Sequence, residues 1–348
     1  MNNNLRLPAE WEPQGAILMA WPHAATDWNY MLDEAQECNI RIIETVSKYA
    51  VVILIAPDVS EPRERLKHIS ADRLLYFEVP TNDTWIRDYG VITTKKDNST
   101  HILNDFGFNA WGGKFESSLD NAVTARMYEA GLLRGEFNNQ LDFVLEGGSI
   151  ESDGEGVILT TTSCLLTPTR NKGYSKEDIE KRLSETLGAK KVLWLDRGEI
   201  LGDDTDGHID TIARLAPHNT ILYCGEGWGI DNADGQSEAL KGVKDCLSTF
   251  TNLNGLPFNL IELPMPSPIY DSDDGHRLPA TYANFLIVNG AVVMPSYGQQ
   301  KNDEYAAMVL RIAFPEHEIV PVDCRALIRQ HGSLHCATMQ VPAEILPL

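Results

Sequence analysis

Short apolar runs that end at a proline alternate along the chain with a segment of helical periodicity. Residues 15–21, 50–56 and 75–79 are predominantly apolar, and Pro22, Pro57 and Pro80 follow them in turn. Runs of this length and composition are typical of buried β-strands. Between the first two runs, residues 31–49 carry apolar side chains at helical spacing, which predicts an amphipathic helix. This alternation predicts an α/β fold.

A similar alternation recurs at comparable intervals. Predicted strands begin at residues 15, 90, 156, 219 and 290, so successive starts lie 75, 66, 63 and 71 residues apart. Helices are predicted at 175–188, 236–247 and 303–313, the first of them capped by Ser175 with Asp178 three residues later. The spacing indicates five repeated units of strands plus helix.

Units that cannot bury their own apolar faces must pack against one another. The prediction is therefore a five-bladed α/β propeller or barrel, formed as a single domain over residues 1–348. An ordinary doubly wound sheet also alternates strand and helix and is the alternative. No glycine-rich phosphate-binding motif follows any predicted strand, which weakens the nucleotide-binding version of that alternative.

The composition narrows the classes of partner. The 348 residues include 29 Lys and Arg against 50 Asp and Glu, which gives a formal net charge of −21. This balance argues against nucleic acid, whose phosphates demand a basic face, and against anionic membrane surfaces. It is compatible with a small cationic substrate drawn towards a negative opening, although solubility alone also explains an acidic protein.

The six cysteines contain no C-x-x-C pair, so neither a disulfide framework nor a zinc motif is expected. Residues 1–6 carry no apolar signal-peptide core, and the longest apolar run, 50–56, is too short to span a bilayer. A reduced, cytoplasmic location is therefore expected. A homodimer is left open.

Residues 202–211 bring four aspartates and one histidine together, directly before the apolar start of a predicted strand. Side chains alternate along a strand, so His208 and Asp210 would face one side and Ile209 the other. An imidazole beside a carboxylate suits proton transfer. A solvated acidic loop with one surface histidine is the alternative.

Three further places could carry chemistry. Asp83 and Asp88 lie in the loop after the predicted strand 75–79, where functional residues concentrate, although a turn and a local ion pair would also explain them. Glu146 precedes a double glycine that would let the backbone approach a ligand, with a plain turn as the alternative. Cys336 follows a loop with histidines nearby, an environment that can lower the pKa of a thiol.

Among the other cysteines, Cys324 is ambiguous. The remaining four lie inside apolar or helical runs and are expected to be buried: Cys38, Cys164, Cys224 and Cys246. A cysteine nucleophile, a histidine and carboxylates from separate loops form a set for covalent catalysis. Two acidic stretches, 203–206 and 271–276, have a calcium-like composition but not the EF-hand spacing. We expect no metal and no cofactor.

Together these places resemble the agmatine deiminase branch of the guanidine-modifying (pentein) superfamily, also labelled bacterial-type peptidylarginine deiminases. The resemblance extends over essentially the whole chain and rests on several motifs in order: Trp11-Glu12-Pro13-Gln14-Gly15, Asp83-Thr84-Trp85-Ile86-Arg87-Asp88, Trp111-Gly112-Gly113-Lys114, Glu146-Gly147-Gly148-Ser149, Arg170-Asn171, Asp204-Thr205-Asp206-Gly207-His208-Ile209-Asp210, Asn284-Phe285 and His335-Cys336. The family fold, five ββαβ units around a pseudo-fivefold axis, is similar to the prediction from the strand spacing.

The resemblance implies a role for each site residue. Cys336 would attack the guanidinium carbon, and His208 would protonate the leaving ammonia and then activate water. Glu146 would lie beside His208, while Asp88 and Asp210 would hold the guanidinium nitrogens. The remaining substrate-binding residues would be Trp85, Asp83, Asp204 and Gly148. Acceptor-only carboxylates suit a planar cation rich in donors, and that cation would favour the thiolate.

The resemblance also implies the reaction: hydrolysis of agmatine to N-carbamoylputrescine and ammonia, in putrescine and polyamine biosynthesis, through an S-alkylthiouronium intermediate on Cys336. The chain departs from the usual family pattern at residues 331–334 and 337–340, which flank the His-Cys pair. Deimination of peptidylarginine or of another arginine derivative is the alternative within the class. A cysteine amidase and a non-enzymatic acidic binder of polyamines are the alternatives outside it.

Overall fold

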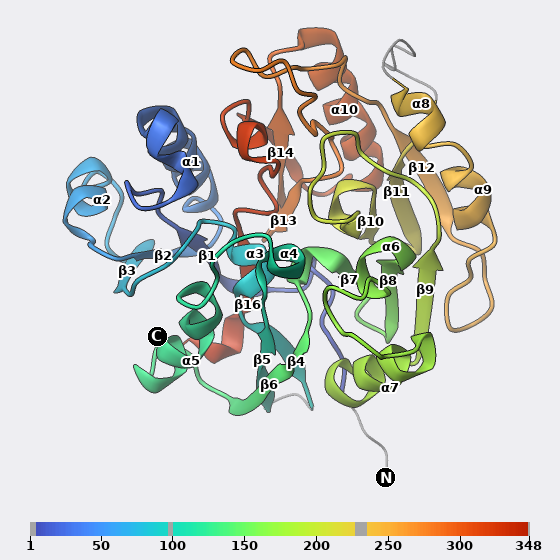
Figure 1. The fold of residues 1–348 in the computed structure, drawn as a ribbon, viewed down its shortest axis with the longest axis horizontal. Coiled ribbons are helices and arrows are strands. Elements are labelled where there is room, and N and C mark those ends of the chain that lie inside the picture. Colours follow the sequence, from blue (N-terminus) through green and yellow to red (C-terminus); the bar gives the residue numbers. More distant parts are fainter. Residues whose placement is uncertain (1–4, 97–99, 227–234, 347–348) are drawn as a thin grey trace.

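The strands form five separate small sheets in the computed structural model, which describes residues 5–96, 100–226 and 235–346 (Figure 1). Residues 1–4, on which part of the signal-peptide expectation rests, lie outside this range. Listed in the order of hydrogen bonding, the sheets are β16 (Met339–Pro342), β1 (Gln14–Ala20), β2 (Val51–Ala56) and β3 (Leu74–Glu78); β4 (Ile92–Lys95), β5 (His101–Gly107) and β6 (Glu136–Val144); β7 (Ile150–Ser152), β8 (Val157–Thr161) and β9 (Lys191–Leu195); β10 (Ala213–Ala216), β11 (Thr220–Cys224) and β12 (Asn259–Leu263); and β13 (Leu286–Val288), β14 (Ala291–Ser296) and β15 (Glu318–Asp323).

All five sheets share one strand pattern. The first strand pairs antiparallel with the second, and the second pairs parallel with the third. A parallel pair needs a crossover connection, and helices occupy these crossovers. In the first sheet the last strand of the chain, β16, supplies the antiparallel partner of β1, so the two ends of the sequence meet in one sheet.

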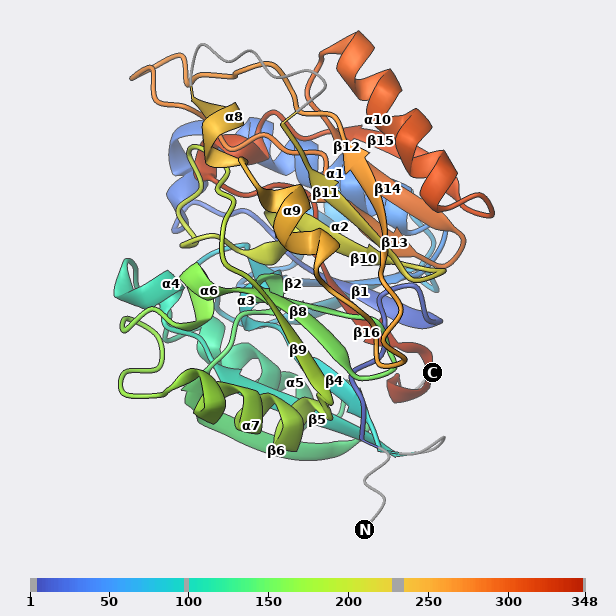
Figure 2. The ribbon, with the colours of Figure 1, turned by 90° about the vertical axis from the view of Figure 1, so that its right-hand side faces the viewer.

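The helices connect the strands and vary greatly in length. Their bounds are α1 (Leu32–Val46), α2 (Ser60–Arg65), α3 (Ile86–Tyr89), α4 (Ala110–Gly113), α5 (Val123–Glu129), α6 (Thr162–Leu165), α7 (Lys176–Leu187), α8 (Gln236–Ala239), α9 (Val243–Ser248) and α10 (Gln300–Ala313). Helices α7 and α10 lie at the periphery of the molecule in both ribbon views (Figures 1 and 2). Within the described residues, no helix has the length and apolar character that crossing a bilayer requires.

The mixed α/β prediction is confirmed, and the predicted strands at 15–21, 50–56 and 75–79 correspond to β1, β2 and β3. The strand β2 is apolar at every position because β1 and β3 flank it and both of its faces are covered. Helix α7 begins as predicted: the Ser175 side chain accepts from the backbone N–H of Asp178, and the Asp178 carboxylate accepts from the backbone N–H of Ser175.

Two details of the prediction were wrong. The helix expected over 236–247 is interrupted between α8 and α9, because Gly242 has a φ of 73° and ends the helical path. The start at Gly90 also does not correspond to the other repeat starts. It introduces β4, an antiparallel first strand, whereas β1, β8, β11 and β14 are second strands. In this sheet the strand equivalent to β1, β8, β11 and β14 is β5, which the pattern of apolar residues did not predict.

Replacing Ser175 by alanine removes the cap of α7 and should lower the free energy of unfolding by about 1 kcal/mol. Urea denaturation followed by circular dichroism measures this loss. Ser184, exposed within the same helix, offers a matched control, because Ser184→Ala changes the same atoms without removing a cap. Equal stability of the two variants would contradict the capping role.

Candidate active site

A cavity of about 250 Å³ opens among loops that come from different sheets. Four aspartates contribute to its wall, together with aromatic side chains and one thiol, and the lining residues include no lysine or arginine. The lining residues are Asp27, Asp83, Trp85, Asp88, Trp111, Phe115, Asp204, Thr205, Gln330, His331, Gly332 and Cys336. The cavity is therefore acidic, with the sulfur of Cys336 in its wall.

Cys336 lies beside the 208–210 segment, as the resemblance requires. Its Sγ is 3.9 Å from Oδ2 of Asp210 and 3.4 Å from Oδ1 of Asn284, and only 6% of the residue is exposed. The same Asn284 oxygen accepts the backbone N–H groups of His335 and Cys336, at 2.9 and 3.3 Å. Burial, reinforced by Asp210 and Asp88, raises the pKa of the Cys336 thiol well above its ordinary value. The thiol is therefore protonated at neutral pH while the cavity holds no cation.

His208 lies between two carboxylates. Its Nε2 is 3.3 Å from Oε2 of Glu146, and its Nδ1 is 3.7 Å from Oδ1 of Asp88. Burial alone would lower the pKa of His208, but Asp88, Cys164 and Glu146 outweigh it and raise the pKa well above the ordinary value. The buried imidazole is therefore protonated on both nitrogens, and positively charged, at neutral pH.

His208 and Asp210 do not lie on a strand, and this prediction was wrong. Residues Ile209–Thr211 form a single 3-10 turn directly before β10, with His208 at its start. Because a turn does not alternate its side chains as a strand does, the two residues reach different partners. His208 faces Glu146 and Asp88, whereas Asp210 contacts His335 and the Cys336 thiol.

The carboxylates differ in their electrostatic surroundings. Burial raises the pKa of Asp88 to about 6, with Glu146 and Asp210 adding to the shift and His208 opposing it. Burial would also raise the pKa of Glu146, but His208 and Arg170 hold it below the usual value. The pKa of Asp210 is likewise lowered against burial, by its hydrogen bond with His335.

Gly148 lets these side chains approach one another. A Cβ at this position would lie 2.6 Å from Nδ1 of His208, 2.9 Å from Oδ1 of Asp88 and 3.1 Å from Oδ2 of Asp210. Its backbone N–H also donates to Asp88 at 3.0 Å. Gly148 is thus the point where the three side chains meet, and any side chain there would occupy the space between them.

The remaining residues named in the sequence analysis lie at the cavity wall. Trp85 is buried against Trp28, with ring centroids 5.7 Å apart. Burial raises the pKa of Asp83 to about 7, and the charges of Asp27 and Asp204 add to the shift. Burial also raises the pKa of Asp204. A cation bound here would offset the charges of Asp27 and Asp204 that raise the pKa of Asp83.

The residues that depart from the family pattern have defined places. His331 and Gly332 line the cavity, and Nδ1 of His331 is 2.8 Å from the carbonyl oxygen of Gly202. A Cβ on Gly332 would lie 2.4 Å from the Trp85 ring, so glycine allows this close approach. Ser333 and Leu334 are buried. The departure therefore affects one side of the cavity wall and leaves the thiol in place.

A second layer of charged residues, which the sequence analysis did not assign, supports the first. Nδ1 of His335 is 2.7 Å from Oδ2 of Asp210, and Nε2 of His335 is 2.8 Å from Oε2 of Glu10. Arg214 donates to Glu10 at 2.8 Å and pairs with Glu151. Arg214 lies within the apolar run 212–215. A charged residue in such a run indicates a buried ion pair, so the sequence did contain a sign of this contact.

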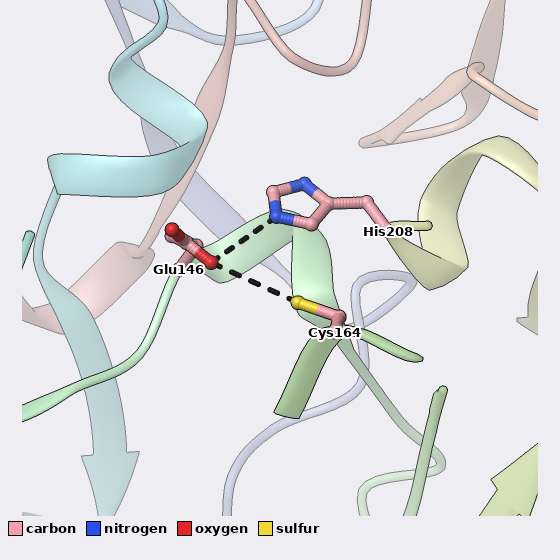
Figure 3. A group of neighbouring side chains, drawn as sticks. All are labelled: Glu146, Cys164 and His208. Carbon is pink, nitrogen blue, oxygen red and sulfur yellow. Dashed lines mark hydrogen bonds and ion pairs between the residues drawn. The ribbon is translucent and has the colours of Figure 1, made fainter. Parts of the chain in front are cut away.

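Cys164 and Arg170 are also neighbours of Glu146. Arg170 donates from Nε to Oε2 of Glu146 at 2.7 Å. The Cys164 thiol lies 3.8 Å from the same oxygen (Figure 3). The prediction that Cys164 is buried is confirmed, as it is for Cys38 and Cys224. Cys246, in contrast, is only partly buried, because it lies on the short helix α9.

The acidic residues with a calcium-like composition have protein partners. Asp203 accepts from the backbone N–H groups of Thr205 and Gly207, at 3.2 and 2.9 Å, and thereby holds the turn before His208. Asp206 pairs with Arg170 at 2.6 Å and with Lys114 at 3.4 Å. These contacts give both carboxylates a structural role around the site.

The comparisons with known proteins agree with the resemblance. The model of the Porphyromonas-type peptidyl-arginine deiminase family matches residues 6–342. Agmatine deiminase of Medicago truncatula is 34% identical, over 98% of this chain and 97% of that protein. A C. jejuni agmatine deiminase variant, solved with substrate bound, is 41% identical with a TM-score of 0.88, over 97% of this chain and 96% of that one.

A more distant likeness supports the fold alone. DDAH from Pseudomonas aeruginosa is 16% identical with a TM-score of 0.52, over 94% of this chain and 99% of that one. A buried thiol, an imidazole and carboxylates around one acidic cavity, within this fold, are features of a guanidine-modifying protein. The chain belongs to the Porphyromonas-type peptidyl-arginine deiminase family.

The surroundings of Cys336 lead to a prediction about its reactivity. Iodoacetamide should alkylate Cys336 slowly at pH 8, because the raised pKa keeps the thiol protonated. Asp88→Asn removes one of the negative charges that raise this pKa and should speed the alkylation. If the pKa of the Cys336 thiol fell by about 1, the thiolate fraction would increase about 10-fold.

Peptide mass spectrometry of quenched samples measures the rate at each cysteine. Cys246 serves as an internal reference, since it is only partly buried and its rate should be the same in both proteins. An unchanged Cys336 rate in Asp88→Asn would contradict the electrostatic account.

Proposed function

We propose that this protein is a hydrolase acting on the C–N bond of a guanidinium group, and that it converts agmatine to N-carbamoylputrescine and ammonia. The observation that carries the proposal is the set of buried carboxylates around the Cys336 thiol, with the protonated His208 beside them. Agmatine is the substrate class of the relatives whose names state it. The product is a precursor of putrescine, which places the reaction in polyamine synthesis.

In this proposal Asp88 and Asp210 orient the guanidinium. Both carboxylates approach Gly148 from different loops, since a Cβ added at this position would lie 2.9 Å from Oδ1 of Asp88 and 3.1 Å from Oδ2 of Asp210. A planar cation with several N–H donors matches acceptor-only groups arranged in this way. The same cation offsets the charges that raise the pKa of Cys336, so the thiol can lose its proton when the substrate binds.

The covalent step then follows from the position of each group. The Cys336 thiolate bonds to the guanidinium carbon, His208 gives its proton to the departing nitrogen, and ammonia leaves from an S-alkylthiouronium. The neutral His208 next removes a proton from water as its oxygen bonds to the same carbon. The C–S bond breaks, the proton on the newly bound oxygen is released to solvent, and the ureido product leaves with the thiolate restored. Glu146, hydrogen-bonded to His208 and Arg170, holds the imidazole in place.

The outer part of the cavity favours agmatine over arginine. Asp27, Asp83 and Asp204 line it, and no lysine or arginine is among its lining residues to receive a carboxylate. The primary ammonium of agmatine would offset the charges of Asp27 and Asp204 that raise the pKa of Asp83, with Trp85 offering an aromatic face to the cationic chain. Deimination of a peptidylarginine, which also lacks a free α-carboxylate, is the second candidate because of the family's description.

A cysteine amidase would use the same thiol and imidazole but would have no need for Asp88 and Asp210. A non-enzymatic polyamine binder would use the acidic cavity but would have no need for the thiol. Both are weaker proposals, because the acids and the thiol lie together.

The finer points of the fold also belong to the proposal. We infer that residues 1–348 form one domain, with the five sheets as blades around a pseudo-fivefold axis. Their shared strand pattern supports this, as does the pairing of β16 with β1. In Figure 1 the chain colours follow one another around the centre of the view. Homodimerisation and a cytoplasmic location remain predictions from the sequence.

Replacing Cys336 by serine should reduce ammonia release from agmatine by at least about 1,000-fold, because the nucleophile is lost. A coupled ammonia assay measures it. Cys246→Ser makes the same exchange on α9, outside the cavity lining, and should retain activity. Retained turnover in Cys336→Ser would exclude the nucleophilic role.

A substrate comparison tests the outer part of the cavity. Ammonia release from agmatine, arginine, a blocked arginine peptide and dimethylarginine should be measured side by side. We expect kcat/KM for agmatine to exceed that for arginine by at least about 100-fold, since bringing a carboxylate against like charges costs several kcal/mol. A preference for the peptide would support the second candidate, and a preference for free arginine would contradict the assignment of the cationic tail.

A further inference from the structure

Glu146, Cys164 and His208 form a compact group of three metal-ligating side chains. One ligand atom from each lies within 4.8 Å of the others, and all three residues are buried (Figure 3). They come from different places in the fold: the loop after β6, helix α6 and the turn before β10. The proposed reaction uses Glu146 and His208 but gives Cys164 no part, so the thiol is unexplained.

The separations within the group fit the coordination shell of a zinc-like ion. With Zn–S near 2.3 Å and Zn–N and Zn–O near 2.0–2.1 Å, tetrahedral angles place sulfur about 3.6 Å from oxygen, and nitrogen about 3.3 Å from oxygen. Here the Cys164 Sγ lies 3.8 Å from Oε2 of Glu146, and Nε2 of His208 lies 3.3 Å from the same atom. Only small side-chain movements would be needed to surround an ion.

The surroundings of the group provide an outer contact, and two of its buried polar atoms have no hydrogen-bond partner. Arg170 donates to Glu146 at 2.7 Å, and such hydrogen bonds orient metal-ligating carboxylates. Oε1 of Glu146 and Nδ1 of His208 are buried without a hydrogen-bond partner. Asp88 and Thr205 line the substrate cavity and contact His208 as well, so the group lies directly behind the wall of that cavity.

A second buried group, made of carboxylates and an imidazole, shows why this one stands out. Glu10, Glu151 and His335 also lie within 4.8 Å of one another. Arg214 already contacts all three members of that group: it pairs with both glutamates and lies 3.0 Å from Nε2 of His335. Its guanidinium therefore occupies the place of a cation there, and that group contains no thiol.

We propose that Glu146, Cys164 and His208 bind a thiophilic divalent metal ion such as Zn²⁺, and that the ion inhibits the enzyme by withdrawing His208 from proton transfer and Glu146 from holding its imidazole. Three bonds to the ion form, and the thiol and the imidazole release their protons to solvent. No electron is transferred. The two charges of the ion replace the charges of two protons, so the buried group keeps its net charge.

Co²⁺ is a suitable probe because a bound thiolate gives cobalt a charge-transfer absorption band. The ion is titrated into reduced, oxygen-free wild-type protein and into Cys164→Ser, Cys164→Ala and Cys336→Ser. We expect one equivalent to produce the band in wild type and in Cys336→Ser, and the band to be lost in both Cys164 variants. Thermal melting without metal confirms that each variant is folded.

A band that persists without the Cys164 thiol would overturn the proposal, as would the absence of a band in wild type. A band lost only in Cys336→Ser would place the ion on the nucleophile instead and would also overturn it. Because this measurement needs no turnover, its failure is distinct from a failure of the proposed function.

The inhibitory part rests on the proposed function and is tested by agmatine turnover in the presence of Zn²⁺. Each protein is compared with its own zinc-free rate. The half-inhibitory concentration should rise at least about 10-fold in Cys164→Ser, since losing even an outer contact of a metal site costs that much affinity. The Cys246→Ser protein should match wild type. An unchanged half-inhibitory concentration in Cys164→Ser would contradict inhibition through this site.

Discussion

The burial of two carboxylates near the Cys336 thiol, Asp88 and Asp210, and of a third, Glu146, beside His208 is the constraint on which the rest of the site depends. Asp88, Glu146 and Asp210 are all almost fully buried. An unpaired buried charge costs several kcal/mol, so each carboxylate needs a partner in the unliganded protein. His208 lies between Asp88 and Glu146, and His335 bonds to Asp210.

Further charged residues contact Glu146 and His335 from the side of the protein interior. Arg170 bonds to Glu146, and Glu10 and Arg214 stand behind His335. These contacts extend the site into the interior. They fix the imidazoles of His208 and His335 through the Nε2 atom of each ring. A deficit of positive charge lies on the cavity side, where Asp88 has its pKa raised to about 6 and the thiol is held neutral. A bound guanidinium supplies the missing charge, so the same electrostatics explain substrate binding and thiol activation.

The sequence predicted most of this arrangement for identifiable reasons. The strands β1, β2 and β3 were recognisable because each is an apolar run closed by proline. The cluster of Cys336, His208 and the acids was recognisable because these residues occur in motifs whose order matches a known family. Helix α7 was recognisable from Ser175 and Asp178.

What the sequence could not provide is contact across long distances in the chain. The turn at Ile209–Thr211 follows from Asp203 and Thr205, which hold the preceding loop through side-chain hydrogen bonds that no periodic pattern reveals. The contact of Cys164 with Glu146 depends on how α6 packs, and an apolar run predicts only that the cysteine is buried. Strand β5 contains Asn104 and Asp105 at buried positions, which concealed it among polar residues.

The account depends most directly on a covalent bond between Cys336 and the substrate carbon. The decisive measurement is rapid acid quenching of the enzyme during agmatine turnover, followed by mass spectrometry of the cysteine-containing peptides. The account predicts that the Cys336 peptide alone gains the mass of agmatine less ammonia. Turnover with that peptide unmodified at every quench time, or the same added mass on another cysteine, would contradict it.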